Sequence, residues 1–556
     1  MQQQCNQCSA PFEITDEDCA IYEKMSPVIG GKQQLIPPPS LCPQCRQQRR
    51  LAFRNDRNYY HNICHLCKKP TISIYSPDKD IPVLCEKCFW GDHWDPLEYG
   101  QKYDSGRPFF EQFAALKKRL PRIAIYHSQS ENADFTVHSS RNRNCYMCSS
   151  TLDCEDVFFT DHFFQSRDCA DIFASIRLEL CYECNFCDEC FGSEFLDHCT
   201  NVSDSTLCYD CRGSQHLIGC AFLRNKQHCI LNKEASPEKC EETRKRFLTD
   251  PAFRADFTRR FIALKLRYPH RSVWLTNTEN CSGNELLNCK NAKHCFNVRH
   301  LEDGKYAYGA YQATDSYDVS RVCGEMMYEC AAIVDLSYGA FCNLTYQCQN
   351  LAYCDNCQGT RDSFGCMSLK KHRYCILNTQ YTQAEYEALV PKIIEYMKQR
   401  REYGEFFPVQ LSPFGYNETK AYDWYPLQKK EVLKRGWQWS DYETPLQDVE
   451  RTIPASKLPP SIDQIPDDIL NWAILCEQTN KPFKIIKQEL EFYRKRGLPI
   501  PHRSPTQRRL DRLNAYNFYT LYDRRCGKCG EEIQTSYQPS RPEVVYCEQC
   551  YLETVY

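Results

Sequence analysis

Several marks of common protein classes are missing from this sequence of 556 residues. No apolar run approaches the ~18–20 residues of a membrane-spanning helix, so we expect no membrane association. The N-terminal MQQQCNQC lacks the basic-then-apolar order of a signal peptide. No phosphate-binding loop, GxSxG elbow or HExxH motif is present, and no small-molecule substrate is evident. A formal net charge of −3 excludes a chain that is basic overall. The missing membrane span, signal peptide and catalytic motifs together predict a cytoplasmic protein that is not an enzyme.

Cysteine is the residue in excess, with 39 in the chain. Without a secretion signal, we expect reduced thiols and not a disulfide framework. Twelve cysteines form CxxC pairs near the two ends, and two CxxC turns together supply the four sulfurs of a tetrahedral zinc ion. The predicted metal ligands are Cys5, Cys8, Cys42, Cys45, Cys64, Cys67, Cys85, Cys88, Cys526, Cys529, Cys547 and Cys550.

An internal copy predicts which CxxC turns share a metal. CHLCKK…VLCEKCFW (64–90) and CGKCGE…VYCEQCYL (526–552) both leave 17 residues between their CxxC pairs. Each segment is therefore one ribbon with one ion, which leaves the pair Cys5/Cys8 for the pair Cys42/Cys45. All four ligands are thiolates and no coordination position stays open, so we predict three zinc ions that are structural.

A fourth site is predicted to be lost. CNQCSAPFEI (5–14) aligns with CEQTNKPFKI (476–485), where Cys476 survives and Thr479 stands in place of Cys8. CPQCRQQRRL (42–51) aligns with PHRSPTQRRL (501–510), where Pro501 and Ser504 replace both cysteines. The C-terminal module is thus a second double ribbon whose first half has no intact zinc site.

The middle of the chain is predicted to be a repeat. Cys148, Cys169, Cys190 and Cys211 are each 21 residues apart, which is typical of a solenoid and too short for a pair of helices. We predict a parallel β-helix with one 21-residue coil per turn, on which Asp168, Glu189 and Asp210 stack outside. A second array follows, because 208–232 and 354–378 share the spacing of four cysteines. Helices that begin at Ser236-Pro237 and at Thr382 are predicted to cap the arrays.

The 25 cysteines between Cys145 and Cys375 have two interpretations. The first is a narrow core of small, buried, reduced thiols. The second is an iron–sulfur cluster or a further zinc site at CYECNFCDEC (181–190), although a ferredoxin run needs a final x3 and a proline, and Phe191 follows here.

Charge is segregated along the chain. Residues 145–211 hold 14 acids against two arginines and no lysine, a surface that would repel phosphate and could bind a basic protein. The ribbon modules carry basic runs with nearby aromatics, a composition that can hold phosphates and stack on bases. The alternative is a connecting segment whose arginines pair with carboxylates. The predicted nucleic-acid-binding residues are Arg46, Arg49, Arg50, Arg54, Arg57, Arg503, Arg508, Arg509 and Arg512.

The predicted fold class is mostly β and multidomain, with zinc ribbons at both ends of two Cys-rich solenoid arrays. The aromatic stretch 405–470 is read as a strap on another domain or as an arm for a partner. The predicted segments are a double ribbon (1–97), a helical linker (98–125), solenoid A (126–233), capping helices (234–270), solenoid B (271–379), a capping helix (380–404), the aromatic strap (405–470) and the second double ribbon (471–556).

The order of these motifs resembles a bacterial family of zinc-ribbon and β-helix proteins that has no assigned function. The residues that carry the resemblance are CNQC…CPQC-RQQRRLAFRNDRNYY, WDPLEYG, GCMSLKKHRYCILNTQYTQAEYEALVPKI, KRGWQWSDYE and CxxC…VVYCEQCY. The resemblance implies the same architecture and assigns no catalytic residue.

Three functions are compatible with the sequence, and the first is favoured. It is a zinc-binding, non-enzymatic scaffold that binds RNA or a ribonucleoprotein through the basic ribbon modules. The second is a scaffold for protein partners that uses the solenoid faces and the aromatic arm. The third, favoured least, is a β-helix enzyme acting on carbohydrate through stacked carboxylates, which is an analogy of fold alone.

Overall fold

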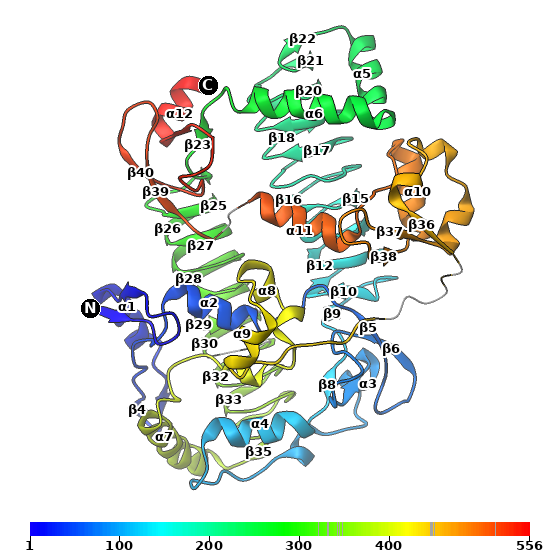
Figure 1. Ribbon diagram of the computed structural model, residues 1–556. Coiled ribbons are helices and arrows are strands. Elements are labelled where there is room, and N and C mark those ends of the chain that lie inside the picture. Colours follow the sequence, from blue (N-terminus) through cyan, green and yellow to red (C-terminus); the bar gives the residue numbers. More distant parts are fainter. Residues whose placement is uncertain are drawn as a thin grey trace. The chain divides into compact units, whose positions relative to one another are not determined.

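The fold is that of a computed structural model, which describes the chain between residues 1 and 555. Residues 321, 331–332, 342, 344, 347, 445–448, 450 and 517–518 lie outside the described part, as do the side chains of 322–327, 333–340 and 345–346. The chain combines helices with extensive sheet (Figure 1). Its three four-cysteine clusters lie near the two ends of the sequence. Part of the predicted aromatic strap, residues 445–448 and 450, falls outside the description.

The chain divides into two units, each built from two stretches of sequence. Unit 1 comprises Met1–Ile125 and Trp274–Tyr442, and unit 2 comprises Tyr126–Val273 and Glu443–Tyr556. Each unit therefore joins one ribbon module to one Cys-rich array that lies far from it in the sequence.

Unit 1 contains the N-terminal ribbons and array B, which we define as residues 275–380. Its helices are α1 (Asp16–Lys24), α2 (Pro43–Leu51), α3 (Glu86–Trp90), α4 (Phe109–Arg119), α7 (Gln383–Gln399), α8 (Lys420–Trp424) and α9 (Lys429–Lys434), with 3-10 turns η1 (Pro96–Tyr99), η2 (Val409–Leu411) and η3 (Tyr416–Glu418). Its ribbon strands are β1 (Gln2–Gln4), β2 (Pro11–Glu13), β3 (Val28–Ile29), β4 (Lys32–Gln33), β5 (Tyr60–Ile63), β6 (Pro70–Ser73), β7 (Val83–Leu84) and β8 (Arg122–Ile123). Array B consists of β24 (Leu275–Thr276), β25 (Gly283–Leu287), β26 (Lys290–Lys293), β27 (Cys295–Lys305), β28 (Tyr311–Val319), β29 (Val322–Cys330), β30 (Ile333–Ala340), β31 (Thr345–Tyr346), β32 (Gln349–Ala352), β33 (Arg361–Phe364), β34 (Cys375–Ile376) and β35 (Thr379–Gln380).

Unit 2 contains array A, which we define as residues 127–234, and the C-terminal ribbons. Array A consists of β9 (His127–Ser128), β10 (Phe135–Val137), β11 (Ser139–Ser140), β12 (Tyr146–Leu152), β13 (Glu155–Phe158), β14 (Asp161–Phe164), β15 (Arg167–Ala170), β16 (Phe173–Ile176), β17 (Glu194–Asp197), β18 (Thr200–Ser203), β19 (Thr206–Tyr209), β20 (Arg212–Ile218), β21 (Gln227–Ile230) and β22 (Lys233–Glu234). The helices are α5 (Pro237–Thr249), α6 (Pro251–Lys265), α10 (Lys487–Arg496), α11 (Pro505–Ala515) and α12 (Glu548–Val555), with 3-10 turns η4 (Ala455–Lys457), η5 (Ile462–Gln464) and η6 (Asp467–Asn471). The remaining strands are β23 (His270–Arg271), β36 (Arg451–Pro454), β37 (Trp472–Leu475), β38 (Pro482–Phe483), β39 (Tyr522–Arg525), β40 (Glu532–Thr535) and β41 (Val545–Tyr546).

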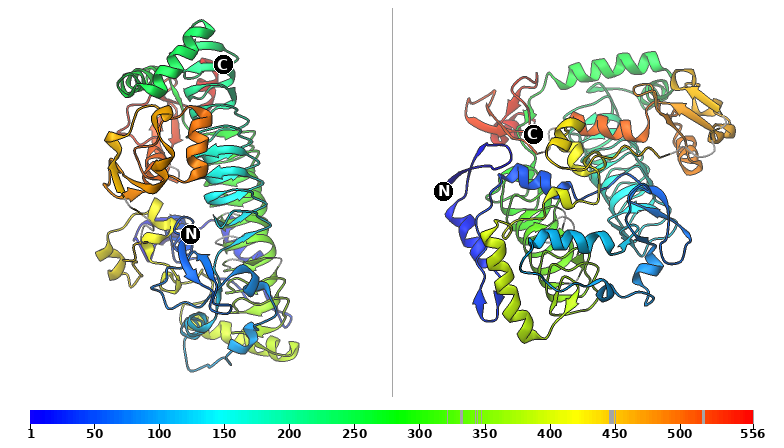
Figure 2. Two further views of the ribbon diagram at one scale, coloured as in Figure 1. Left: turned by 90° about the vertical axis from the view of Figure 1, so that its right-hand side faces the viewer. Right: turned by 60° about the horizontal axis from the view of Figure 1, so that its bottom comes forward.

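The repeat of both arrays is 12 residues, and the predicted 21-residue coil is wrong. In array A, Glu155 pairs in parallel with Arg167, and Arg167 with Glu179. In array B, Gln349 pairs with Arg361 and Phe364 with Ile376 at the same offset, with a few offsets of 11 elsewhere. Figure 2 shows the strands of each array as successive rungs. Inward positions recur at every third residue, so two buried cysteines can be separated by any multiple of three residues. The spacing of 21 is one such multiple and is not the length of a coil.

A three-residue backbone unit produces this repeat. One residue pairs with the neighbouring rungs, the next adopts a left-handed conformation, and the third points inward, as in Tyr182 (paired), Glu183 (φ 48°) and Cys184 (fully buried). Asparagine and aspartate tolerate the left-handed region best among residues with a side chain. They form hydrogen-bonded stacks there, for example Asn132 to Asn144 (3.0 Å) and Asn144 to Asp156 (3.0 Å).

The abundance of cysteine follows from the inward positions. The thiols of Cys184 and Cys187 donate to the carbonyl oxygens of the residues two positions earlier, at 3.4 Å and 3.2 Å. Serine does the same at equivalent positions, since Ser175 Oγ donates to Phe173 O at 3.0 Å and accepts from Cys187 N at 3.0 Å. A core this narrow favours small side chains with a donor, and cysteine combines that donor with apolar character. The structure therefore agrees with the interpretation of a core of buried thiols.

Helices pack on the arrays within each unit. α5 and α6 begin after Ser236 and Asp250, whose side chains accept from the helix backbone, and α7 begins with a capping box of Thr382 and Glu385, as the sequence predicts for Ser236 and Thr382. α5 contacts β20 and β21, and α7 contacts β34. The part of the aromatic strap that belongs to unit 1 packs on α2, where Trp437 and Tyr416 join Leu51 in one buried cluster.

Candidate metal centres

The twelve predicted cysteines form three clusters, in the grouping that the internal copy predicts. The sulfur atoms of each cluster lie within 4.8 Å of one another. Neighbouring sulfurs are 3.7 Å apart for Cys8 and Cys42, 3.9 Å for Cys67 and Cys85, and 3.8 Å for Cys529 and Cys547. A tetrahedral ion with metal–sulfur bonds of about 2.3 Å needs sulfurs about 3.8 Å apart, so each cluster has the size of a four-cysteine metal site.

Each cluster is built from one hairpin and one helix N-terminus. The first CxxC turn joins two antiparallel strands: β1 and β2, β5 and β6, or β39 and β40. The second pair begins a helix, with Cys42 as the N-cap of α2 and Cys85 as the N-cap of α3. Backbone N–H groups at a helix N-terminus favour a thiolate, so the local fold supports the negative charge that a cation needs.

Hydrogen bonds lower the pKa of one cysteine in each cluster and so favour its thiolate form. Burial opposes ionisation of Cys64, but N–H groups of Cys85, Cys67 and Leu66 lower its pKa to about 6. The same balance lowers the pKa of Cys526 to about 6. In the first cluster, hydrogen bonding from the Cys45 thiol lowers the pKa of Cys42 to about 5. Burial raises the pKa of the cluster partners Cys88 and Cys550 to about 12, and a bound cation would have to displace those protons.

The fourth ribbon keeps the backbone of a metal-binding turn without its ligands. Ser9 N donates to Cys5 O at 2.9 Å, and Asn480 N donates to Cys476 O at 2.8 Å. Ser9 and Asn480 both adopt a left-handed conformation, with φ of 61° and 54°. Cys476 is the single sulfur at this position, and it packs in a buried apolar cluster with Ile474 and Phe483. Apolar packing thus takes the place of a metal ion here.

The alignment of 5–14 with 476–485 holds, but that of 42–51 with 501–510 is wrong by three residues. Asn6 N donates to Ser40 O, two residues before Cys42, whereas Glu477 N donates to His502 O, two residues before Ser504. Ser504 therefore occupies the place of Cys42, not that of Cys45, and each is an N-cap followed by a proline at the start of its helix. Gln507 then replaces Cys45. The sequence alignment had matched the letters QRRL that both segments share. In the structure the helices correspond as CPQCRQQRR and SPTQRRLDR.

The array cysteines that the structure describes form no comparable cluster. Within the described residues, the three four-cysteine groups are the only ones in which three or more ligand atoms of cysteine, histidine or acid lie within 4.8 Å. Cys181, Cys184, Cys187 and Cys190 all point inward and are fully buried. Their thiols donate to backbone carbonyl oxygens, so the geometry does not favour the iron–sulfur or extra zinc interpretation.

The basic run of α2 contacts array B. Arg46 and Arg50, one helical turn apart, both bind the carboxylate of Asp318, at 2.9 Å and 3.2 Å. All three side chains are at most 1% exposed. We call this arrangement an arginine clasp: two arginines of one helix that share one buried aspartate of an array.

Unit 2 contains a second arginine clasp. Arg508 and Arg512 of α11 bind Asp171 of array A at 2.8 Å and 3.0 Å. In the corrected alignment Arg508 stands in the place of Arg46 and Arg512 in the place of Arg50. Asp171 and Asp318 have φ of 56° and 54°, the left-handed position of the repeat. Both modules therefore attach to their arrays by the same contact, although the first half of the C-terminal module has no metal-ligand set.

The other predicted nucleic-acid-binding arginines are also held by protein carboxylates. Arg49 binds Glu329 and Glu405, Arg54 binds Asp56, and Arg57 binds Asp423. In unit 2, Arg509 lies 3.8 Å from Asp161, and Arg503, the one exposed member, bridges Glu477 and Asp511. The placement matches the carboxylate-paired alternative of the sequence analysis. RNA binding stays a prediction, and these nine side chains do not form an open surface for phosphates.

The acidic segment 145–211 finds basic partners within its own unit. Glu194, fully buried, binds Arg244 at 2.8 Å and Arg496 at 2.9 Å. Asp168 lies 3.2 Å from Lys495. The segregation of charge along the sequence thus reflects recognition between array A and the helices that pack on it.

The three carboxylates predicted to stack on adjacent coils are not brought together. Their spacing of 21 is not a multiple of the 12-residue repeat, so they occupy different sides of array A. Asp168 pairs with Lys495, Glu189 with Arg177, and Asp210 with Arg224. Burial raises the pKa of Asp210, an effect that Arg224 opposes. The carboxylate pair on which the carbohydrate-enzyme hypothesis depends is absent from these residues.

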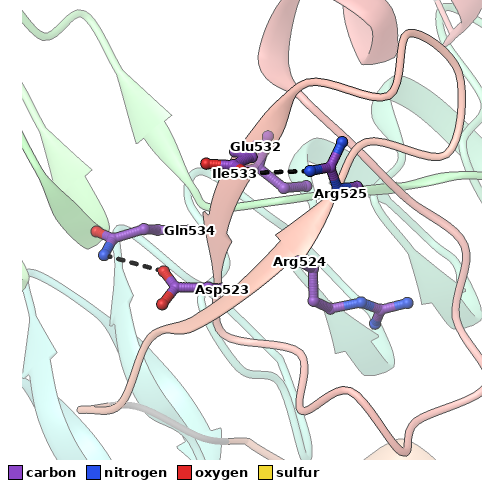
Figure 3. A pocket seen from close by; sticks show the side chains of 6 residues that line it. All are labelled: Asp523, Arg524, Arg525, Glu532, Ile533 and Gln534. Atoms are coloured by element: carbon purple, nitrogen blue, oxygen red, sulfur yellow. Dashed lines mark hydrogen bonds and ion pairs between the residues drawn. The ribbon is translucent and has the colours of Figure 1, made fainter.

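Two surface pockets offer candidate sites. One, of about 490 Å³, surrounds the β39–β40 hairpin, where Arg525 pairs with Glu532 at 3.1 Å and Gln534 with Asp523 at 3.5 Å (Figure 3). Arg524 points away from these pairs in Figure 3. The other lies on array A, where Arg167 pairs with Glu179 at 2.6 Å. In both pockets the paired charges satisfy one another, unlike the convergent unpaired groups of a catalytic site.

Comparisons with known proteins assign no relative. No protein-family model matches the chain, and no curated protein matches it. In the described part of the chain no helix has the length and apolar character of a membrane span. The resemblance to the bacterial ribbon and β-helix family stays a prediction.

The residues that complete the arginine clasps were missed by the sequence analysis. Asp318 and Asp171 carry no local motif that distinguishes them from other acids of the arrays. The sequences of the two helices that carry the arginines do share a pattern. In both helices a cysteine or serine cap and a proline precede two arginines four residues apart.

Proposed function

We propose that this protein is a non-enzymatic scaffold for a protein partner, in which structural metal ions and arginine clasps hold two ribbon modules onto two Cys-rich arrays. The duplicated arginine clasp carries the proposal. The residues best suited to bind nucleic acid are used internally in both modules, which removes the main support for RNA contact through them.

The three metal ions of the proposal are zinc. Thiolate ligands in a closed tetrahedron suit zinc, and the sulfur spacing of each cluster has the size of such a site. Because each ribbon is small and has little apolar core of its own, metal binding would supply much of its folding free energy.

We further propose that each array closes into a solenoid with coils of 12 residues. Four pairings per repeat support this, as at Arg167–Glu179, Ala170–Tyr182, Phe173–Asn185 and Ile176–Asp188. Twelve residues could extend over about 40 Å, whereas neighbouring rungs are about 4.8 Å apart, so the chain must turn back on itself within each repeat.

The array surfaces are the regions that the proposal leaves for a partner. Array A exposes a charged face on which Arg143 pairs with Glu155 and Arg177 with Glu189, with these side chains 35–57% exposed. The strap residues Trp437 and Tyr416 are buried in unit 1, so they are not available as a peptide-like arm. The free array thiols suit a reducing compartment, and we propose a cytoplasmic location.

The proposal is tested by crosslinking the protein in its native cells along two routes. Amine-to-carboxyl protein crosslinking with mass spectrometry should join array A peptides to one recurrent protein partner, and ultraviolet crosslinking should recover RNA only at background. Variants Glu155→Arg and Glu179→Arg should then abolish the protein crosslink without changing the zinc content. A defined RNA recovered in stoichiometric amount, with no protein crosslink to the arrays, would contradict the proposal and restore the RNA scaffold.

A further inference from the structure

At one position of the repeat, the paired residues of successive rungs form a column along each array. In array A the paired residues from Glu131 to Gln227 read E-R-E-R-E-F-S-Q-Q. In array B those from Glu279 to Arg373 read E-K-E-T-E-S-Q-R-R. We call these columns ladder A and ladder B.

Charges in the two ladders alternate with one exception. Every other arginine or lysine has an acid on a neighbouring rung, and in ladder A Arg143 binds Glu155 and Arg167 binds Glu179. Along the pairings that define the two ladders, Arg361 and Arg373 are the only like-charged neighbours. Adjacent rungs are about 4.8 Å apart, and like charges directly opposite each other on paired strands are destabilising.

Another arginine pair, outside the ladders, shows how the fold balances such neighbours. Arg212 pairs with Arg224 on adjacent rungs of array A. The carboxylate of Asp210 lies 3.7 Å from Arg212 and 3.0 Å from Arg224, so one buried acid serves both cations. This comparison indicates that two arginines on adjacent rungs of an array are stabilised by an anion between them.

Among the described residues, Arg361 and Arg373 have no such counter-charge. Both are exposed, and in the described part of the chain neither guanidinium has an ion pair or a side-chain hydrogen bond. Lys371, also exposed, adds a third cation two positions before Arg373, and its aliphatic chain lies against Gly359 one rung below. The end of array B thus holds three cations on two rungs, and no described acid binds the two arginines.

From this arrangement we propose that Arg361 and Arg373 bind a phosphoryl group. A dianionic group with several oxygens can accept hydrogen bonds from two guanidinium groups at once, which is the geometry that arginine favours for phosphate. The bound group would supply the negative charge that an acidic rung supplies elsewhere in the ladder. Lys371 adds a point charge beside it.

The internal copy provides the variant for the test. Ladder A carries Gln215 and Gln227 where ladder B carries Arg361 and Arg373, so glutamine is compatible with this position of the fold. The variant is R361Q/R373Q, and the matched control is R143Q/R167Q, which removes two arginines of ladder A that have acidic neighbours. Zinc content and circular dichroism of both variants report whether the fold is retained.

Binding is measured by isothermal titration calorimetry of the full chain. The probes are inorganic phosphate, a phosphoserine peptide with its unphosphorylated form, and a short single-stranded RNA with a 5′-phosphate or a 5′-hydroxyl. We expect R361Q/R373Q to weaken binding of the phosphorylated probes at least tenfold and R143Q/R167Q to change it less than twofold. The three kinds of probe distinguish free phosphate, a phosphorylated protein and a nucleic-acid terminus as the source of the group.

Three results would overturn the proposal. They are no binding of any phosphorylated probe by the wild-type protein, equal loss in both variants, or unchanged binding by R361Q/R373Q. Stability gives an independent readout, because in phosphate-free buffer R361Q/R373Q should unfold at the same or a higher denaturant concentration than the wild-type protein. A clearly lower midpoint would mean that the two arginines are structural.

Discussion

Replacing Asp318 by asparagine should destabilise unit 1 strongly. Arg46 and Arg50 share this carboxylate, and all three side chains are at most 1% exposed. Asparagine keeps an oxygen acceptor and tolerates the left-handed backbone, which has φ of 54° here, so the change removes charge and little else. Two guanidinium groups would remain buried without a counter-charge. Breaking a buried ion pair by removing one partner costs about 3–5 kcal/mol, and we expect Asp318→Asn to fall in that range.

Asp315→Asn provides the matched control on the same strand of array B. Asp315 is also left-handed, with φ of 45°, and its carboxylate lies 3.6 Å from Lys24 in a pair that is 40–52% exposed. An exposed pair contributes only about 0–1 kcal/mol, so this variant should unfold almost as the wild-type protein does.

The assay is equilibrium unfolding in denaturant, followed by tryptophan fluorescence. Six of the seven tryptophans belong to unit 1, so the signal reports mainly this unit. We expect a midpoint for Asp318→Asn well below that of Asp315→Asn, with the same slope. Equal midpoints for the two variants would refute the reasoning that the arginine clasp holds α2 on array B.

Three further outcomes follow from the contacts described above. A strong chelator should remove three zinc ions per chain and lower stability, whereas Cys476→Ser should leave the zinc content at three, as measured by elemental mass spectrometry; four ions per chain, or stoichiometric iron, would contradict the site assignment. Cys187→Ser should cost less stability than Cys187→Val in thermal unfolding, because serine keeps the donor to Asn185 O and valine cannot; the opposite order would contradict the account of the array core. Burial raises the pKa of Glu489 from 4.5 to about 7. The stability that this residue contributes is therefore present below about pH 4.5 and is lost as pH rises through about 7. Glu489→Gln should flatten this pH dependence in a series of unfolding curves, and an unchanged slope would contradict the assignment.

The four-cysteine clusters were the most predictable part of the molecule. A CxxC turn is a local feature, and an equal gap of 17 residues in two segments indicated which turns form one cluster. Capping signals at Ser236 and Thr382 are equally local, and both helices begin where the sequence indicates.

The repeat was detected, but its length was not. Every third residue points inward, so cysteine spacings of 12 and of 21 are both allowed by the core, and the spacings of 21 were the ones that stood out in the sequence. Only the pairing of backbones distinguishes them, as at Glu155 and Arg167. The positions of Asp168, Glu189 and Asp210 were misjudged for the same reason.

The partners of the basic residues were beyond sequence reasoning. Arg46 and Asp318 are 272 residues apart, and nothing near either one indicates the other. Arginine beside aromatic residues is typical both of nucleic-acid surfaces and of buried ion pairs that lie over rings, as Arg46 lies 5.3 Å from the ring of Tyr306. Burial decides between the two, and burial depends on the tertiary fold.

The central claim, that the basic helices are internal contacts and not binding surfaces, is tested most directly by the reactivity of the arginines. The native protein is treated with an arginine-selective dicarbonyl reagent, and the modified positions are read by mass spectrometry. We predict that Arg46, Arg50 and Arg508 stay unmodified until the protein is unfolded, while the exposed Arg361 and Arg373 react early. Rapid modification of Arg46 and Arg50 in the native protein would contradict the account.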